Sequence, residues 1–211
     1  MDPEVQGVLA AAKERWPHIH ISDSLVMADT AIRMCEEGCE AIAVLGVDFM
    51  SENVRAIINE AGYEHVQVYR MAEANIGCSL AEAAETEAYK AYLEKAGSVP
   101  HSLHVVYINT SLYTKALGDF LVPTITCTSS NVVSTVLQAA AQVPDLNVWY
   151  GPDSYMGANL VELLTRVSKL SDDEVRELHP EHTAETIRSL IPRVHHFDAG
   201  ICTVHDMFGG D

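Results

Sequence analysis

The stretch Ala41-Ile42-Ala43-Val44-Leu45-Gly46-Val47-Asp48 indicates the fold class of this chain. Its first five residues form a continuous apolar run, which is typical of a short strand buried on both faces of a parallel sheet. The next three residues predict a turn, and Ser51 is expected to cap a helix that includes residues 54–58. A strand, a turn and a helix in this order make the unit from which α/β folds are built.

The same unit recurs along the chain. Strand patterns are expected at residues 18–21, 65–69, 103–108, 125–126 and 147–150. Helical patterns are expected at residues 25–35, 80–93 and from starts near Ser129 and Met156, and Gly38 is expected to end the first of them. Alternating strands and helices of this length predict an α/β fold with a parallel sheet and helices on its faces.

The composition narrows the classes of function. With 211 residues, 48% of them apolar and 20% charged, the chain is expected to fold into one large domain or two small ones. Its formal charge of −17 argues against a nucleic-acid or acidic-membrane partner. No apolar run approaches the ~20 residues that span a bilayer, and no basic segment precedes an apolar one at the start, so we expect a soluble chain without a targeting segment. Five scattered cysteines favour a reducing compartment.

An internal repeat relates the two halves of the chain. Ser24 and Ser129 both open expected helices, and Asp48 and Asp153 both follow expected strands, with the same offset of 105 residues in each pair. The two Gly-led cysteines, Cys78 and Cys202, lie 124 residues apart, which leaves about nineteen residues for a polar helical insertion near 170–190. We therefore expect one domain over residues 1–100 and a second over 101–211, with the break near residues 97–101.

Polar residues at helix starts and strand ends are candidates for ligand binding. Ser24 and Ser129 are expected where helix N–H groups bind phosphate or carboxylate, although plain helix capping also explains each serine. Tyr107 and Asn109 are expected on one face at the carboxyl end of a strand, where α/β sheets bind ligands, although a satisfied strand-end pair is the alternative.

The repeat also predicts a metal centre. Pseudo-symmetry would bring Cys78 and Cys202 toward a common axis, and an iron–sulfur cluster held by a third thiolate from another copy would leave one iron open to substrate. The alternatives are two inert buried cysteines, or a zinc site formed by Cys202, His205 and either His195 or His196. The other three cysteines, Cys35, Cys39 and Cys127, are interpreted as structural. The tripeptide 179–181 is expected to be a solvated connection between helices.

Seven short motifs, taken in order, resemble the quinolinate synthase family over essentially the whole chain. They are Ser22-Asp23-Ser24-Leu25, Gly46-Val47-Asp48-Phe49-Met50, Gly77-Cys78-Ser79, Val106-Tyr107-Ile108-Asn109-Thr110-Ser111, Cys127-Thr128-Ser129-Ser130-Asn131, Gly151-Pro152-Asp153 and Cys202-Thr203-Val204-His205. The residues 122–127 and the insertion between Gly157 and Gly200 look most like the plant-type members, which work in plastids. Members of other types are expected in the cytoplasm.

The resemblance implies three pseudo-symmetric three-layer αβα domains around a [4Fe–4S] cluster, of which this chain holds two. Such transferases condense iminoaspartate with dihydroxyacetone phosphate to quinolinate for NAD biosynthesis, and an open iron assists as a Lewis acid. By motif match, Cys78 and Cys202 are two of the three cluster ligands, and Tyr107 and Asn109 are catalytic residues that hold the substrate skeleton. Ser24 and Ser129 are expected to bind its carboxylate or phosphate groups, and His179-Pro180-Glu181, which is similar to a third-domain motif, is not transferred. The expected partners are the two substrates and the iron–sulfur assembly machinery, with a homodimer as one assembly.

Two departures from the family pattern concern the ends of the sequence. Family members carry a His-Tyr-Tyr-type strand motif before the segment that begins here at Met1, and a third domain with the third cluster cysteine after the segment that ends here at Asp211. We therefore expect a fragment of an enzyme, with weak or no catalysis by the isolated chain. The alternative is a non-catalytic anion-binding or oligomerisation module descended from the enzyme.

Overall fold

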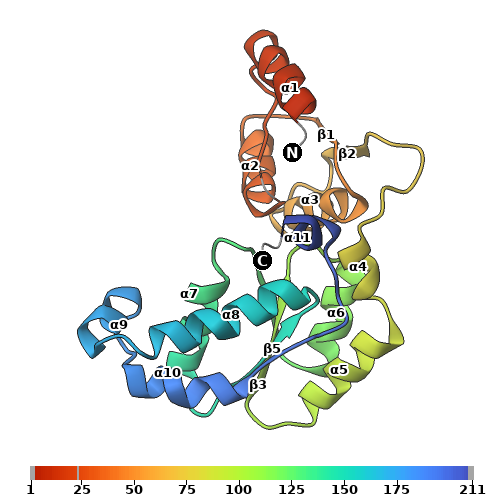
Figure 1. Cartoon of the computed structure of the whole chain (residues 1–211). Coiled ribbons are helices and arrows are strands. Elements are labelled where there is room, and N and C mark those ends of the chain that lie inside the picture. Colours follow the sequence, from red (N-terminus) through yellow and green to blue (C-terminus); the bar gives the residue numbers. More distant parts are fainter. Residues whose placement is uncertain (1–2, 23, 209–211) are drawn as a thin grey trace. The chain divides into compact units, whose positions relative to one another are not determined.

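The chain divides into two compact units. A computed structural model describes residues 3–22 and 24–208, and its units are Met1–Ala74 and Asn75–Asp211 (Figure 1). The division between the units therefore follows Ala74, whereas the break predicted from the sequence was near residues 97–101. The reason is packing, because helix α5 (Glu87–Gly97) buries Tyr89 and Leu93 in one hydrophobic cluster with Trp149 of the second unit.

The first unit contains a parallel pair of strands. Its elements are α1 (Pro3–Arg15), α2 (Ser24–Glu36), β1 (Ala41–Val44), α3 (Asp48–Glu60) and β2 (Gln67–Arg70). The strands pair in register from Ala41 with Gln67 to Val44 with Arg70. One cluster of buried residues joins them to α2 and α3, and its members are Ala31, Cys35, Ile42, Val44, Val54, Ile58 and Val66. This core confirms the strand predicted for the run that begins at Ala41, but the strand is buried on one face only, because Ala41 and Ala43 are exposed.

Two other predictions in the first unit were wrong. Residues 18–21 form no strand, since this segment is largely exposed and does not pair with either strand of the unit. Ser51 lies inside α3, which begins three residues earlier at Asp48, and its hydroxyl donates to the Asp48 carbonyl oxygen at 2.9 Å. Gly38 does end α2 as expected, with a φ of +90° that glycine adopts without strain.

The second unit is built on a four-stranded parallel sheet with the order β4-β3-β5-β6. The strands are β3 (Ser102–Tyr107), β4 (Thr124–Cys127), β5 (Asn147–Gly151) and β6 (Val194–His196). The helices are α4 (Ser79–Ala83), α5 (Glu87–Gly97), α6 (Leu112–Leu121), α7 (Val132–Gln142), α8 (Ser154–Val167), α9 (Asp172–Leu178), α10 (Ala184–Leu190), the single turn η1 (Ile191–Arg193) and α11 (Thr203–Phe208). Parallel strands joined by helices confirm the α/β fold class.

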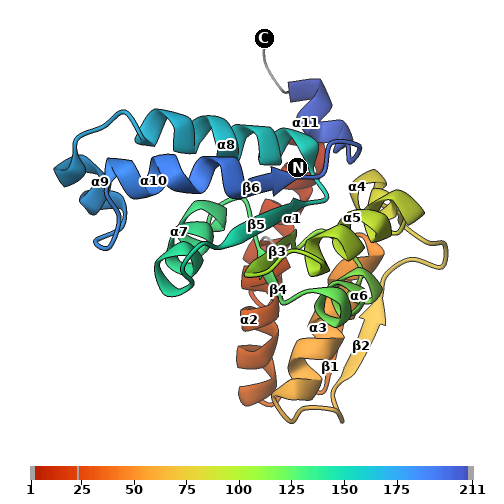
Figure 2. The same cartoon turned by 90° about the horizontal axis from the view of Figure 1, so that it is seen from below.

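Helices cover both faces of this sheet. Helices α7, α8 and α10 lie on one face and α5 and α6 on the other (Figure 2). Strand β5 shows how the sequence produces this arrangement, because its side chains alternate between the faces. Val148 and Tyr150 pack into the cluster with α7 and α8, whereas Trp149 packs into the cluster with α5. None of the described helices is long and apolar enough to cross a membrane.

Two helical predictions in the second unit need correction. The helix expected over residues 80–93 is divided into α4 and α5, because the Thr86 hydroxyl accepts from the Tyr89 N–H and starts a new helix. The predicted insertion forms α9 and α10, and its connection is solvated at Pro180 and Glu181, which are exposed, but not at His179. His179 and His182 are both buried, and His182 Nε2 lies 2.8 Å from the Leu137 carbonyl oxygen.

Candidate functional site

The candidate site residues of the second unit gather at the carboxyl end of its sheet. Tyr107 is the last residue of β3, and Asn109 lies in the bend that follows. Ser129 lies in the turn after β4, and Asp153 comes two residues after the end of β5. Neighbouring parallel strands bring these loops to one edge, where α/β sheets bind their ligands. Asn109 is beyond the strand, so strand alternation does not set its direction as the sequence analysis expected.

Tyr107 is half-buried among polar neighbours. Burial raises the pKa of its phenol, and a hydrogen bond with Ser129 lowers it. Negative charge on Asp153 and Cys202 raises the pKa of Tyr107 further. The phenol therefore stays protonated near neutral pH and is available as a hydrogen-bond donor, in a place where residues from three loops meet.

The turn after β4 is held by side chains. The Thr128 N–H donates to Asn131 Oδ1 at 2.7 Å, and the hydroxyls of Thr128 and Ser130 lie 2.8 Å apart. Helix α7 begins only at Val132, so Ser129 precedes it and is not the helix start that was predicted. Its exposed hydroxyl contacts Tyr107 instead.

The bend that carries Asn109 is held by a lysine from the next helix. Lys115 Nζ donates to the carbonyl oxygen of Ile108 at 3.0 Å and also to that of Thr110. These two residues flank Asn109 in the chain, and Thr110 is fully buried. Lys115 was not identified from the sequence, where its spacing of five to seven residues from the bend gives no distinct pattern.

The two predicted cluster ligands lie on adjacent segments of the second unit. Cys78 is the N-cap residue of α4, and Cys202 directly precedes α11. Ser79 joins them, because its hydroxyl lies 3.3 Å from the Ile201 carbonyl oxygen and 3.2 Å from the Thr203 hydroxyl. Both thiols are free and half-exposed. Figures 1 and 2 both show α4 beside α11. The role of Cys78 and Cys202 as iron ligands stays a prediction.

Close packing at Gly200 sets the position of the Cys202 segment. A Cβ atom at Gly200 would lie 1.8 Å from the Pro152 carbonyl oxygen, so only glycine fits there. The Gly200 carbonyl oxygen in turn accepts from the Ser154 N–H at 2.8 Å. The loop after β6 is thus pressed against the loop after β5.

This packing pairs two residues that the sequence analysis did not bring together. Asp153 has no exposed surface, and its Oδ2 lies 2.5 Å from His205 Nδ1. Its Oδ1 accepts from the Met156 N–H at 3.0 Å and caps α8. One ligand atom each from Asp153, Cys202 and His205 lie within 4.8 Å of one another. Asp153 and His205 each belong to a short motif that the sequence shows, but their separation of 52 residues in the chain gives no sign that the two side chains are in contact.

The remaining predicted residues lie elsewhere. Among the described residues, His195 and His196 do not join the group of Cys202 and His205, and His195 stacks on Trp149 with ring centroids 4.2 Å apart. The described residues therefore do not assemble the alternative zinc set of Cys202, His205 and either His195 or His196. Ser24 is the first residue of α2 in the first unit, and its side chain is buried.

The three cysteines interpreted as structural are distinct from the pair at the site. Cys35 and Cys127 are buried, and burial raises the pKa of Cys127 to about 12 and raises that of Cys35. Cys39 Sγ lies 2.9 Å from the Ala41 carbonyl oxygen in the first unit.

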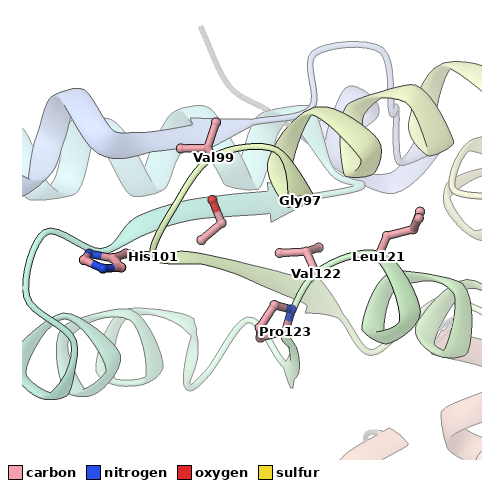
Figure 3. Close-up of a pocket in the computed structure, with 7 residues that line it drawn as sticks. Gly97, Val99, His101, Leu121, Val122 and Pro123 are labelled. Atoms are coloured by element: carbon pink, nitrogen blue, oxygen red, sulfur yellow. The ribbon is translucent and has the colours of Figure 1, made fainter.

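A small cavity lies at the opposite edge of the second sheet. Its volume is about 220 Å³, and it is found where β3 and β4 begin (Figure 3). Its lining is Gly97, Val99, His101, Ser102, Leu121, Val122 and Pro123. None of the candidate site residues is among them, so the cavity is separate from the carboxyl-end site.

Comparison with known proteins assigns the family. A model of the family described as "Quinolinate synthetase A protein" matches residues 3–211. The chain is 65% identical over 209 residues to "Quinolinate synthase, chloroplastic" of Oryza sativa subsp. japonica and 63% identical to the protein of that name in Arabidopsis thaliana. Each match covers 99% of this chain and 29% of the relative, so the chain spans less than a third of their length.

A more distant relative is "Quinolinate synthase" of Sulfurisphaera tokodaii, which is 30% identical over 161 residues, or 75% of this chain and 46% of that protein. The chloroplastic names of the plant relatives support the plastid location that the resemblance implied. Since the family model extends over nearly the whole chain, this chain belongs to the quinolinate synthetase A family.

Proposed function

We propose that this chain supplies part of the active site of a plastid quinolinate synthase, which condenses iminoaspartate with dihydroxyacetone phosphate in NAD biosynthesis. The names of its relatives support the activity. The observation that carries the proposal is the gathering of Tyr107, Asp153 and Cys202 at the carboxyl end of one parallel sheet, with Cys78 on the adjacent segment.

The two half-exposed thiols fit the ligand chemistry of a [4Fe–4S] cluster. Iron–sulfur clusters are bound by cysteine thiolates, and Cys78 and Cys202 are both free and carried by segments that Ser79 connects. Cys127 does not suit this role, because its buried thiol has a pKa raised to about 12. When bound by three thiolates, such a cluster supplies one open iron as a Lewis acid.

The polar residues at the strand ends would bind and orient the substrates. The protonated Tyr107 phenol would donate to a substrate carboxylate or carbonyl oxygen, and the Asn109 amide, in the bend that follows β3, would add a further hydrogen bond to the substrate. The Ser129 hydroxyl would form a hydrogen bond with Tyr107 that orients the phenol, and would donate to a phosphate or carboxylate oxygen of the substrate. We propose the same anion-binding role for Ser24 of the first unit.

Anaerobic reconstitution of the chain with iron and sulfide tests the cluster assignment. We expect Cys78→Ser and Cys202→Ser each to lose most of the bound iron and sulfide. Cys39→Ser is the matched control, since it removes another half-exposed thiol from the first unit and should leave the content unchanged. If the double variant of Cys78 and Cys202 bound as much iron and sulfide as the wild-type chain, the assignment would be contradicted. If the wild-type chain bound neither iron nor sulfide, the result would favour the non-catalytic module.

The activity test uses the same reconstituted protein. The described residues bring two candidate thiols to the site, whereas the proposed cluster needs three, so the 211 residues alone are expected to make little quinolinate from the two substrates. Robust turnover by these residues would refute this expectation. In an active quinolinate synthase that contains this segment, Tyr107→Phe should reduce turnover by about tenfold or more, which corresponds to one lost hydrogen bond to a charged group.

A further inference from the structure

We propose that Asp153, Cys202 and His205 form a mononuclear binding site for a divalent cation of the zinc class. The three residues offer one carboxylate oxygen, one thiolate sulfur and one imidazole nitrogen, and these atoms lie within 4.8 Å of one another. Zinc is held by this mixture of ligands, and three protein ligands with an open fourth position are the arrangement of its catalytic sites. The site goes beyond the proposed cluster, which would not use Asp153 or His205.

The geometry needs only a small adjustment to accept a metal. His205 Nδ1 and Asp153 Oδ2 are 2.5 Å apart, within hydrogen-bond distance. Across a tetrahedral zinc ion with bonds of about 2.0–2.1 Å, the nitrogen and oxygen would be about 3.3 Å apart. His205 is on the short end helix α11 and is one-third exposed, so it can move by this amount, whereas Asp153 is fixed by its cap on α8.

Binding is balanced by the loss of one proton. A neutral His205 keeps its proton by moving it from Nδ1 to Nε2, which frees Nδ1 for the metal. The Cys202 thiol releases its proton to solvent and binds as the thiolate. The anionic carboxylate of Asp153 and the chain's formal charge of −17 both attract a cation.

Sharing of Cys202 has a consequence that rests on the proposed function. Zinc and the cluster would both need the Cys202 thiolate, so they would compete for it in the same molecule. A chain loaded with zinc at Asp153, Cys202 and His205 would therefore resist cluster assembly, and removal of zinc by a chelator would restore it.

The test measures the affinity of the whole chain for zinc by competition with a chromophoric chelator, and the ligand set by cobalt substitution. We expect one zinc ion per chain and a thiolate-to-cobalt charge-transfer band with tetrahedral d–d bands. Cys202→Ser should abolish that charge-transfer band. His205→Gln should weaken zinc binding about tenfold to a hundredfold or more, a loss at least as large as that caused by removing an outer-shell partner.

Four variants keep the outcome decisive. Cys78→Ser should lose the cluster and keep zinc, whereas His205→Gln should lose zinc and keep the cluster, so failure of one proposal is distinguished from failure of the other. His195→Gln is the matched control, because this histidine stacks on Trp149 away from the group. Asp153→Asn retains an acceptor for the Met156 N–H and thus separates loss of metal from loss of fold. Unchanged zinc affinity in His205→Gln, or loss of zinc in Cys78→Ser, would overturn the proposal.

Discussion

The hydroxyl groups of Ser79 and Thr203 lie 3.2 Å apart, although 124 residues separate them in the chain. Each residue directly follows a candidate ligand, Cys78 or Cys202. The contact therefore ties the two cysteine-bearing segments together, and it places both at the start of a short helix. This relationship is the structural basis for treating the two thiols as one site.

The first prediction concerns this tie. Ser79→Ala removes both hydrogen bonds of the hydroxyl, to Ile201 and to Thr203. A net hydrogen bond contributes about 1 kcal/mol, so we expect a reconstituted cluster to release its iron to a chelator roughly fivefold faster. Ser98→Ala is the control, because it removes an exposed hydroxyl that contacts only its own helix end, at Lys95. Equal release rates in the two variants would show that the tie does not matter.

A second prediction concerns the close approach at Gly200. Gly200→Ala places a Cβ atom 1.8 Å from the Pro152 carbonyl oxygen, so the loop must shift. Overpacking of this kind typically costs about 1–3 kcal/mol, and the free energy of unfolding should fall accordingly. Urea denaturation followed by Trp149 fluorescence measures it in a Trp16→Phe background, which leaves a single tryptophan.

The matched control for that substitution is Gly7→Ala. A Cβ atom at Gly7 meets nothing within 4 Å, and this residue lies inside α1, where alanine is favoured by about 0.5–1 kcal/mol. We expect no loss of stability there. A Gly200→Ala chain as stable as the parent, with the same zinc affinity, would refute the packing argument.

A third prediction concerns the bend that presents Asn109. Lys115→Met removes the ammonium group that donates to the carbonyl oxygens of Ile108 and Thr110. Backbone amides of residues 108–111 should then exchange faster with deuterated solvent, because local opening costs less free energy. Lys90→Met is the control, since the ammonium group of Lys90 lies on the partly exposed side of α5 and forms a long 4.0 Å ion pair with Glu87. Unchanged exchange in Lys115→Met would contradict a positioning role.

A fourth prediction uses the buried histidine of the second sheet. His104 has no exposed surface, and burial lowers its pKa to about 3, while its Nε2 lies 2.8 Å from the Tyr89 hydroxyl. Between pH 3 and about 6.5, the unfolded chain therefore binds a proton that the folded chain excludes. The free energy of unfolding should fall as the pH falls through this window, by up to about 1.4 kcal/mol per pH unit from this residue.

Comparison of two variants isolates that contribution. His104→Gln should be less stable than the parent at pH 7 and should lose less stability between pH 6.5 and 4. His101→Asn is the control, because His101 is exposed and asparagine tolerates its positive φ of 53°. Urea denaturation at several pH values gives the slopes, and equal slopes in His104→Gln and the parent would disprove the assignment.

The sequence was sufficient for the fold class and for most strands. Continuous apolar runs indicate parallel strands covered on both faces, as in β5, whereas β1 buries only Ile42 and Val44 and leaves Ala41 and Ala43 exposed. The repeat was also recovered at the level of elements, since a short helix follows each of Cys78 and Cys202. Local patterns gave a wrong prediction where a strand needs a neighbouring strand to pair with. Residues 18–21 alternate like a strand, but they pair with no described strand.

The sequence alone determined the family, the parallel α/β architecture and the residue types at the strand ends, because these depend on local patterns and on short motifs in a fixed order. Only the tertiary structure brought His205 to Asp153 and assigned Asn75–Gly97 to the second unit. The physical reason is that both depend on side-chain packing between distant segments. Gly200 against Pro152 and Tyr89 against Phe197 are contacts that no spacing along the chain encodes.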